Sequence, residues 1–135
     1  MLTRTITRQY EFSSAHWLPG VHDGHKCKTQ HGHNYTVEVT IGGEVNPRTG
    51  FIIDFWDLDK IVQPVIDQVD HRTLNYVNGL ENPTAENIAL WFFNKLTASA
   101  TDKDAGGYVY LHSTLNVRSI RVYETRNCWS DITGD

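Results

Sequence analysis

The sequence has little of what marks a secreted or a membrane-spanning protein. Its 135 residues include only two cysteines, Cys27 and Cys128. They form no Cys-x-x-Cys pair, which argues against a disulfide framework and for free thiols in a reducing compartment. No apolar run approaches the length of a membrane span, and the first residues enter an alternating pattern without an apolar signal segment. We therefore expect a cytoplasmic protein with no membrane partner.

A basic surface is also missing. Lysine and arginine total 12 against 16 acidic residues, for a formal charge of −4, and no run of basic residues occurs. This balance argues against a nucleic-acid partner, although it leaves room for local positive patches that bind small anions. Internal repeats, low-complexity segments and breaks in composition are absent as well. The chain is therefore expected to form one domain over residues 1–135.

What the sequence does have is a pair of histidines at the start of a long alternating stretch. Side chains alternate between the two faces of a strand, so His31 and His33 share a face that is otherwise apolar. The apolar members of that face are Tyr35, Val37, Val39 and Ile41. Imidazoles two residues apart on a strand, roughly 7 Å apart at Cα, can converge on one ion. Zinc is the obvious candidate, and a catalytic zinc usually keeps three protein ligands, so a third histidine should point to the same place.

The first stretch of the chain supplies that histidine. The alternation of residues 2–12 carries its apolar parity on to His16. If this strand pairs with residues 35–41, His16 emerges at its end on the same face as His31 and His33. A lone histidine on an apolar face is more often a hydrogen-bonded core residue than a ligand. Three histidines on matching faces of paired strands favour a metal site instead.

Residues 18–30 are rich in turn formers and are predicted to form a loop that holds Cys27. Three interpretations of this cysteine stay open. It could be a fourth zinc ligand that closes a structural site, a reactive thiolate favoured by neighbouring lysines and a nearby cation, or an inert loop thiol. His22 and His25 have no periodic context and are interpreted as surface residues.

A first helix is predicted after a turn in the middle of the chain. Asp54 precedes an apolar stripe at three- and four-residue spacing over residues 58–69, which is typical of a helix that packs on a sheet. Pro64 is expected to kink this helix without ending it, because the stripe continues beyond it. The turn formers before the helix predict that residues 51–53 form a hairpin with the preceding strand.

A second helix is predicted to begin at Thr84, which resembles an N-cap, with Glu86 in its first turn. Its aromatic side chains are interpreted as core. Residues 108–111 and 117–125 are expected to be strands, and residues 131–135 are expected to fray.

Carboxylates and a further histidine stand at the ends of these elements. Asp70-His71 follows the first helix and is either a surface pair or an acid-base couple in which the carboxylate orients the imidazole. Glu124 ends an apolar-facing row on the last predicted strand. It lies either at the water boundary or in a position held for a ligand, because an unpaired buried carboxylate is costly.

Taken together, these residues resemble the 6-pyruvoyl-tetrahydropterin synthase family, and most closely its bacterial branch, the 6-carboxy-5,6,7,8-tetrahydropterin synthases of the queuosine pathway. The resemblance runs from about Tyr10 to Thr125, and its ordered combination is more specific than any single motif. The chain departs from the family pattern in a longer connector, Ala98 to Asn116, and in its ending from Arg126 on. The motifs that carry the resemblance are Phe12-Ser13-Ser14-Ala15-His16, His25-Lys26-Cys27, His31-Gly32-His33, Ile53-Asp54-Phe55, Asp70-His71, Pro83-Thr84-Ala85-Glu86-Asn87 and Glu124-Thr125.

The resemblance implies an α+β architecture known as the tunnelling fold, with a four-stranded antiparallel sheet and two helices on one face. Three subunits are then expected to close a twelve-stranded barrel, and two trimers to stack into a homohexamer with sites at subunit interfaces. Closure of the sheets edge to edge removes exposed edge strands, which gives the assembly a physical motive.

The resemblance also assigns expected roles. His16, His31 and His33 would bind Zn²⁺; Cys27, Asp70 and His71 would transfer protons; Glu124 would anchor the pterin, with Thr84 and Glu86 helping to seat it. Lys26, beside Cys27, is an electrostatic candidate for the triphosphate.

The implied reaction converts 7,8-dihydroneopterin triphosphate to 6-carboxy-5,6,7,8-tetrahydropterin with release of acetaldehyde and triphosphate. The alternatives are a 6-pyruvoyl-tetrahydropterin synthase, which keeps the side chain, and a non-catalytic, zinc-stabilised pterin-binding module.

Overall fold

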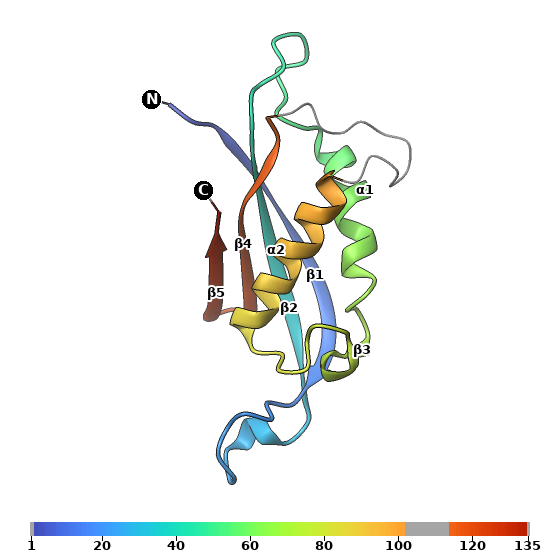
Figure 1. Cartoon of the computed structure of the whole chain (residues 1–135), viewed down its shortest axis with the longest axis vertical. Coiled ribbons are helices and arrows are strands. Elements are labelled where there is room, and N and C mark those ends of the chain that lie inside the picture. Colours follow the sequence, from blue (N-terminus) through green and yellow to red (C-terminus); the bar gives the residue numbers. More distant parts are fainter. Residues whose placement is uncertain (1, 102–113, 135) are drawn as a thin grey trace.

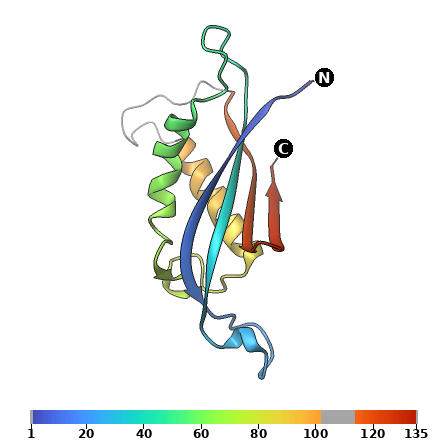
Figure 2. The same ribbon diagram turned by 180° about the vertical axis from the view of Figure 1, so that it is seen from behind.

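The computed structural model describes residues 2–101 and 114–134, which form a long sheet covered by helices on one face (Figure 1). Seen from behind, the sheet lies in front of both helices, so its second face carries none of them (Figure 2). The elements are β1 (Thr5–His16), η1 (Lys26–Lys28), β2 (His31–Gly42), α1 (Phe55–Ile66), β3 (Arg72–Thr73), η2 (Leu74–Tyr76), α2 (Ala85–Thr101), β4 (Asn116–Thr125) and β5 (Cys128–Thr133). The α+β class with two helices on one face is confirmed.

The sheet has five strands in the order β3-β1-β2-β4-β5, where four were expected. Every pairing is antiparallel except that of β3, which lies parallel to β1 over two residue pairs. The expected strand 108–111 lies outside the described residues. Of residues 131–135, which were predicted to fray, residues 131–133 belong to strand β5, where Ile132 pairs with Ile120 and packs against the core.

Apolar alternation fixes which face of the sheet is buried. Val37 and Val39 of β2 are fully buried together with Ile120 and Val122 of β4, and the side chains between them point to the other, more polar face. Each such side chain loses its contact with water, which is worth about 1.5–3 kcal/mol before the entropy of ordering is counted. The register is therefore strongly specified, since a slip by one residue would turn the apolar row to solvent.

Helix α1 begins as predicted but ends early. Asp54 Oδ1 accepts the N–H of Trp56 at 2.7 Å, which caps the helix. The helix ends at Ile66, only two residues after Pro64, although it was expected to continue over the whole stripe. Beyond Ile66, the N–H groups of residues 68 and 69 bond to carbonyls three residues back, which tightens the chain into turns of the 3-10 type. Val69 is nevertheless fully buried, so the stripe predicts burial beyond the helix itself.

The predicted hairpin over residues 51–53 is wrong. Strand β2 pairs with β1 on one side and with β4 on the other, so it offers no free edge to a further strand. The turn formers instead close a local loop, in which Gly50 N donates to Asn46 O at 2.7 Å and Asn46 N donates to Phe51 O at 2.8 Å. Gly50 adopts a φ of 78°, a left-handed conformation that favours glycine.

Helix α2 follows the prediction more closely. Thr84 Oγ1 accepts the N–H of Asn87 at 3.2 Å, and Ile88, Phe92 and Leu96 of the same helix face are buried. Within residues 2–101 and 114–134, no helix has both the length and the apolar character needed to span a membrane.

Candidate functional site

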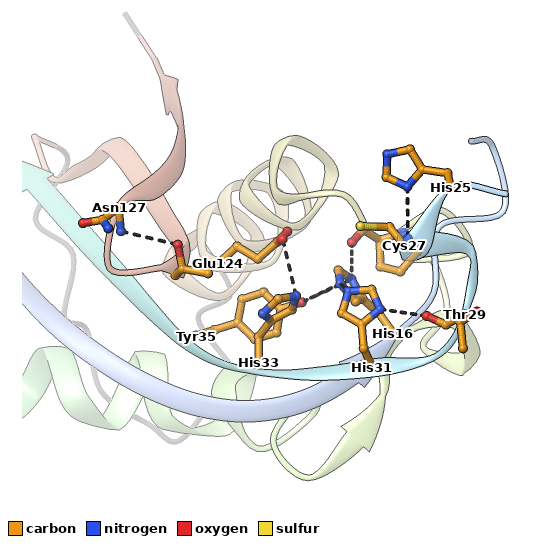
Figure 3. Close-up of polar contacts among 11 residues, drawn as sticks. His16, His25, Cys27, Thr29, His31, His33, Tyr35, Glu124 and Asn127 are labelled. Carbon is orange, nitrogen blue, oxygen red and sulfur yellow. Dashed lines mark hydrogen bonds and ion pairs between the residues drawn. The ribbon is translucent and has the colours of Figure 1, made fainter. Parts of the chain in front are cut away.

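The pairing of β1 with β2 brings the three predicted histidines together. His16 lies opposite His31, and Ser14 lies opposite His33, so all three imidazoles leave the sheet on the helix-covered face (Figure 3). Their ring centroids are 4.6 to 5.1 Å apart, and one potential ligand atom of each lies within 4.8 Å of the others. The predicted convergence is confirmed as a group that could hold a metal ion.

Backbone carbonyls set the tautomers of two of these rings. His16 Nδ1 lies 2.8 Å from Pro83 O, and His31 Nδ1 lies 2.8 Å from Thr29 O. A carbonyl oxygen only accepts, so each Nδ1 carries the hydrogen and each Nε2 carries the lone pair that a metal needs. The two Nε2 atoms are 3.1 Å apart. Two lone pairs that face each other at this distance repel, and a shared cation relieves that repulsion.

His33 supplies a further argument for a cation. Its Nε2 is buried and has no hydrogen-bond partner among the described residues; the nearest charge is Glu124 Oε1 at 3.4 Å. Burial lowers the pKa of both His33 and His16 below the usual value for histidine. The rings are therefore neutral near pH 7, which is the form that binds zinc. Three imidazole donors fit a metal centre that keeps a coordination position open.

Tyr35 forms the floor of this group. Its hydroxyl lies 3.2 Å from His16 Nδ1, and its fully buried ring stacks on Phe12 at a centroid distance of 4.8 Å. Burial raises the pKa of Tyr35 above the usual range, so the phenol stays neutral. The sequence placed Tyr35 in the core but gave no sign of its contact with His16. The carbonyl groups that orient the rings were missed as well, because backbone oxygens leave no mark in a sequence pattern.

Cys27 lies in the short turn η1, between β1 and β2, and is half-buried. Figure 3 draws it on the same side of β2 as the histidines. Among the described residues, the group of side chains that could share a metal consists of the three histidines and does not include this cysteine. The geometry therefore gives no support to a closed structural site with Cys27 as fourth ligand.

Asp70 and His71 lie elsewhere, along the outer edge of β1. Asp70 Oδ1 accepts the N–H of Ser13 at 3.0 Å and lies 2.9 Å from His71 Nδ1. The Ser13 N–H and then the His71 imidazole hold the pKa of Asp70 below its usual value. His71 adopts a φ of 55° and has a side chain 82% exposed. It borders a groove with Asn34 and Gly32, whose side of the sheet faces away from the helices.

The structure thus confirms the contact between Asp70 and His71 but does not join the pair to the cysteine. No contact of either residue with Cys27 is found in the described part of the chain. The expected proton-transfer set is therefore divided between two places of the single chain.

The remaining expected site residues surround the histidines unevenly. Glu124, the penultimate residue of β4, is half-buried and points toward His33 (Figure 3). The Thr84 hydroxyl is already bound to the N-terminus of α2, and Glu86 is exposed in the first turn of that helix. Lys26 is exposed on η1, whereas Lys28 Nζ is bound to Asp23 Oδ1 at 2.8 Å.

Comparisons with known proteins place the sequence beside pterin enzymes. The family model described as 6-pyruvoyl tetrahydropterin synthase matches residues 5–135. A putative 6-carboxy-5,6,7,8-tetrahydropterin synthase of Archaeoglobus fulgidus is 40% identical over 121 residues, 90% of this chain and 88% of the relative. A 6-carboxy-5,6,7,8-tetrahydropterin synthase of Haemophilus influenzae is 32% identical, covering 89% of this chain and 92% of the relative. A dihydroneopterin monophosphate aldolase of Pyrococcus furiosus is 42% identical over 66 residues, 49% of this chain and 54% of the relative.

Solved structures give the same fold. The 6-pyruvoyl tetrahydropterin synthase of Caenorhabditis elegans superposes with a TM-score of 0.80 at 28% identity, covering 100% of this chain and 98% of that one. The enzyme of the same name from Plasmodium vivax gives a TM-score of 0.67 at 20% identity, with 98% of each chain covered. At that identity the second likeness bears on the fold alone.

Proposed function

The chain belongs to the 6-pyruvoyl tetrahydropterin synthase family, and from this membership we propose that it is a zinc-dependent lyase of 7,8-dihydroneopterin triphosphate. Its products would be 6-carboxy-5,6,7,8-tetrahydropterin, acetaldehyde and triphosphate, as a cytoplasmic step of queuosine biosynthesis. The observation that carries the proposal is the convergence of His16, His31 and His33 with two Nε2 lone pairs turned inward. The names of the relatives that match most of the chain favour the carboxy product over the pyruvoyl product.

The histidine group would bind the zinc, which when bound polarises the side-chain hydroxyl groups of the substrate and eases the loss of their protons. Cys27 lies on the same side of β2 and would act as a base at a side-chain carbon of the substrate. Asp70, held by Ser13 and turned to His71, would orient the imidazole that moves protons on the opposite side of the substrate.

Because Cys27 and His71 lie apart in one chain, we assign them to the same site across a subunit interface. The sheet has the open edges that such an assembly needs. β3 pairs with β1 only at Ser14 and Ala15, so the outer edge of β1 before them has no strand partner among the described residues. The outer edge of β5 is open in the same sense. A trimer that joins these edges would close a barrel of twelve strands, four from each chain (β1, β2, β4 and β5, with the two-residue β3 left outside), and two trimers would form the homohexamer.

Glu124 is suited to anchor the pterin. A carboxylate can accept two parallel hydrogen bonds from the amino group and the adjacent ring nitrogen, which fixes the orientation of the ring. Thr84 and Glu86 would seat the same ring at the start of α2. Lys26 would attract the triphosphate through its exposed charge.

The deciding experiment is mass analysis of the products after zinc-loaded protein is incubated with 7,8-dihydroneopterin triphosphate, with any volatile aldehyde trapped. Carboxy-tetrahydropterin with acetaldehyde supports the proposal. Pyruvoyl-tetrahydropterin would keep the site and change the branch, toward the activity named for the Caenorhabditis structure.

Two further outcomes would overturn the proposed reaction. A released two-carbon fragment that still carries phosphate would indicate an aldolase, the activity named for the Pyrococcus relative. Stoichiometric pterin binding without any loss of triphosphate would indicate the non-catalytic binding module.

A further inference from the structure

The loop before the histidine pair contains a contact that the proposed mechanism leaves unused. His25 precedes η1, and its ring nitrogen Nδ1 accepts the backbone N–H of Cys27 at 3.0 Å (Figure 3). We propose that His25 is a positioning residue that holds Cys27 in its working place through this hydrogen bond. The inference rests on the proposed role of Cys27 and adds to it the residue that fixes the cysteine.

The hydrogen bond defines the chemical state of the ring. A backbone N–H can only donate, so Nδ1 of His25 must carry a lone pair and the hydrogen must lie on Nε2. His25 therefore acts as the N-cap of the short turn, a place more often taken by aspartate, asparagine, serine or threonine. It is half-buried, whereas its neighbour His22 in the same loop is exposed.

Both backbone groups of Cys27 are tied down. Its N–H is bound to the His25 ring, and its carbonyl accepts the N–H of Leu18 at 2.8 Å. Leu18 lies two residues after His16, so the second bond joins the turn to the end of β1 that carries the metal group. The His25 carbonyl also accepts the N–H of Lys28 at 3.0 Å. The side chain of His25 is the one replaceable link in this frame, since every other bond is made by backbone atoms.

This frame matters because a catalytic base must reach the reacting carbon within a few tenths of an ångström. A shift of about 1 Å can lower a rate by about a hundredfold. Loss of the cap would free the backbone of Cys27 on one side while leaving the thiol itself and the three histidines intact.

The test uses the full-length, zinc-loaded protein in a Cys128→Ser background, so that Cys27 is the only thiol. His25→Ala is expected to lower kcat about tenfold with KM changed less than about twofold, because the loss concerns position and not substrate binding. His25→Asn should restore most of kcat, since its side-chain oxygen can accept the same N–H. His22→Ala is the control: it removes the ring that packs against His25, with centroids 5.3 Å apart, but keeps the hydrogen bond to Cys27, so it should stay close to the parent protein.

A second readout does not depend on turnover. Alkylation of Cys27 by iodoacetamide should become at least about threefold faster in His25→Ala, because the freed turn exposes a half-buried thiol, and should return to the parent rate in His25→Asn. A slower reaction with substrate combined with a faster reaction with a small reagent is the signature of a displaced thiol. Unchanged kcat and unchanged alkylation in His25→Ala would overturn the inference, as would an Asn variant no better than the Ala variant.

Hydrogen exchange separates this inference from the proposed function. In the Cys128→Ser protein labelled with ¹⁵N-cysteine, the Cys27 amide gives a single backbone signal, and we expect it to be protected from exchange. Exchange at the rate of an unstructured peptide would overturn the inference even if His25→Ala failed to fold. Protein that shows no lyase activity would refute the proposed function, yet the exchange and alkylation measurements would still decide whether His25 holds Cys27.

Discussion

Two regions beside β1 show opposite degrees of completeness. The three histidines on the helix-covered face are gathered, turned and desolvated by their own chain, with carbonyls already bound to the outer nitrogens of two rings. Asp70 and His71, on the outer edge of the same strand, are joined to each other and to Ser13, but the side chain of His71 is 82% exposed. The first region, which we call the finished region, is complete within a single chain; the second, which we call the unfinished region, leaves its imidazole open to solvent.

The difference follows from how each region is built. The register of β1 and β2 determines where each side chain of the pair lies. That register is held by the whole row of buried side chains on the two strands. Asp70 and His71 lie after a helix that has already ended, in a turn with one left-handed residue. Such a segment is well placed to serve a site formed with another subunit, because it presents its functional groups outward.

The largest effect is expected when one of the three histidines of the finished region is replaced. His31→Ala should abolish zinc binding and lower turnover by at least about a thousandfold, since two imidazoles hold zinc far more weakly than three. Zinc content by atomic absorption and turnover are measured on the same preparation. His22→Ala, an exposed histidine outside the group, serves as control and should retain both. A His31→Ala protein with full zinc would show that the ion is bound elsewhere.

Cys27→Ala should separate the metal from the chemistry. We expect it to retain zinc and to lose turnover by roughly a hundredfold to ten-thousandfold, the usual contribution of a general base. Cys128→Ala is the matched control, because that thiol lies exposed at the start of β5. A metal-free Cys27→Ala protein would contradict the assignment of Cys27 as a base and would indicate that it is a fourth metal ligand.

Mixing two inactive variants tests whether the unfinished region is completed by a neighbour. Cys27→Ala and His71→Ala chains, refolded together at equal amounts, should recover about a quarter of the parent activity if each site takes the two residues from different subunits. The fraction follows from the chance that both contributors to a site are intact. If one chain supplied both residues, no mixture of these variants would recover activity.

The sequence predicted the finished region well because strand alternation is a strict rule. His16, His31 and His33 could be placed on one face from parity alone, and the buried row of β2 followed in the same way. The caps at Asp54 and Thr84 were also predicted, since capping residues act locally.

What failed depended on distant partners. Residues 51–53 form no hairpin because both edges of β2 are already occupied, and residues 131–133 form a strand because β4 offers them a free edge. Neither fact can be read from the segments themselves. His25 was missed for another reason, since its task is performed by a ring nitrogen two residues before Cys27, where histidine is an unusual cap.

Asp70→Asn should have a moderate effect, on stability at neutral pH. The folded state lowers the pKa of Asp70, so its charge stabilises the fold above the pKa of the unfolded chain, near 3.8, and this contribution is lost as the pH falls further. In thermal melts of the metal-stripped protein, the variant should unfold at a lower temperature than the parent at pH 7. The two midpoints should converge as the pH falls below 3.8 and through the lowered pKa of the folded state. A difference that stayed constant down to that pH would show that the charge of Asp70 contributes nothing.

The smallest effect is expected at the floor of the finished region. Tyr35→Phe removes a hydroxyl 3.2 Å from His16 Nδ1 but keeps the ring that stacks on Phe12. Because His16 Nδ1 remains bound to Pro83 O, the imidazole should keep its tautomer, and zinc affinity should fall by less than about tenfold, below the usual cost of losing an outer partner of a metal ligand. Competition with a chromophoric chelator measures this change. A larger loss would mean that the Pro83 carbonyl alone cannot hold His16, and that the histidine group depends on the Tyr35 side chain as well as on backbone carbonyls.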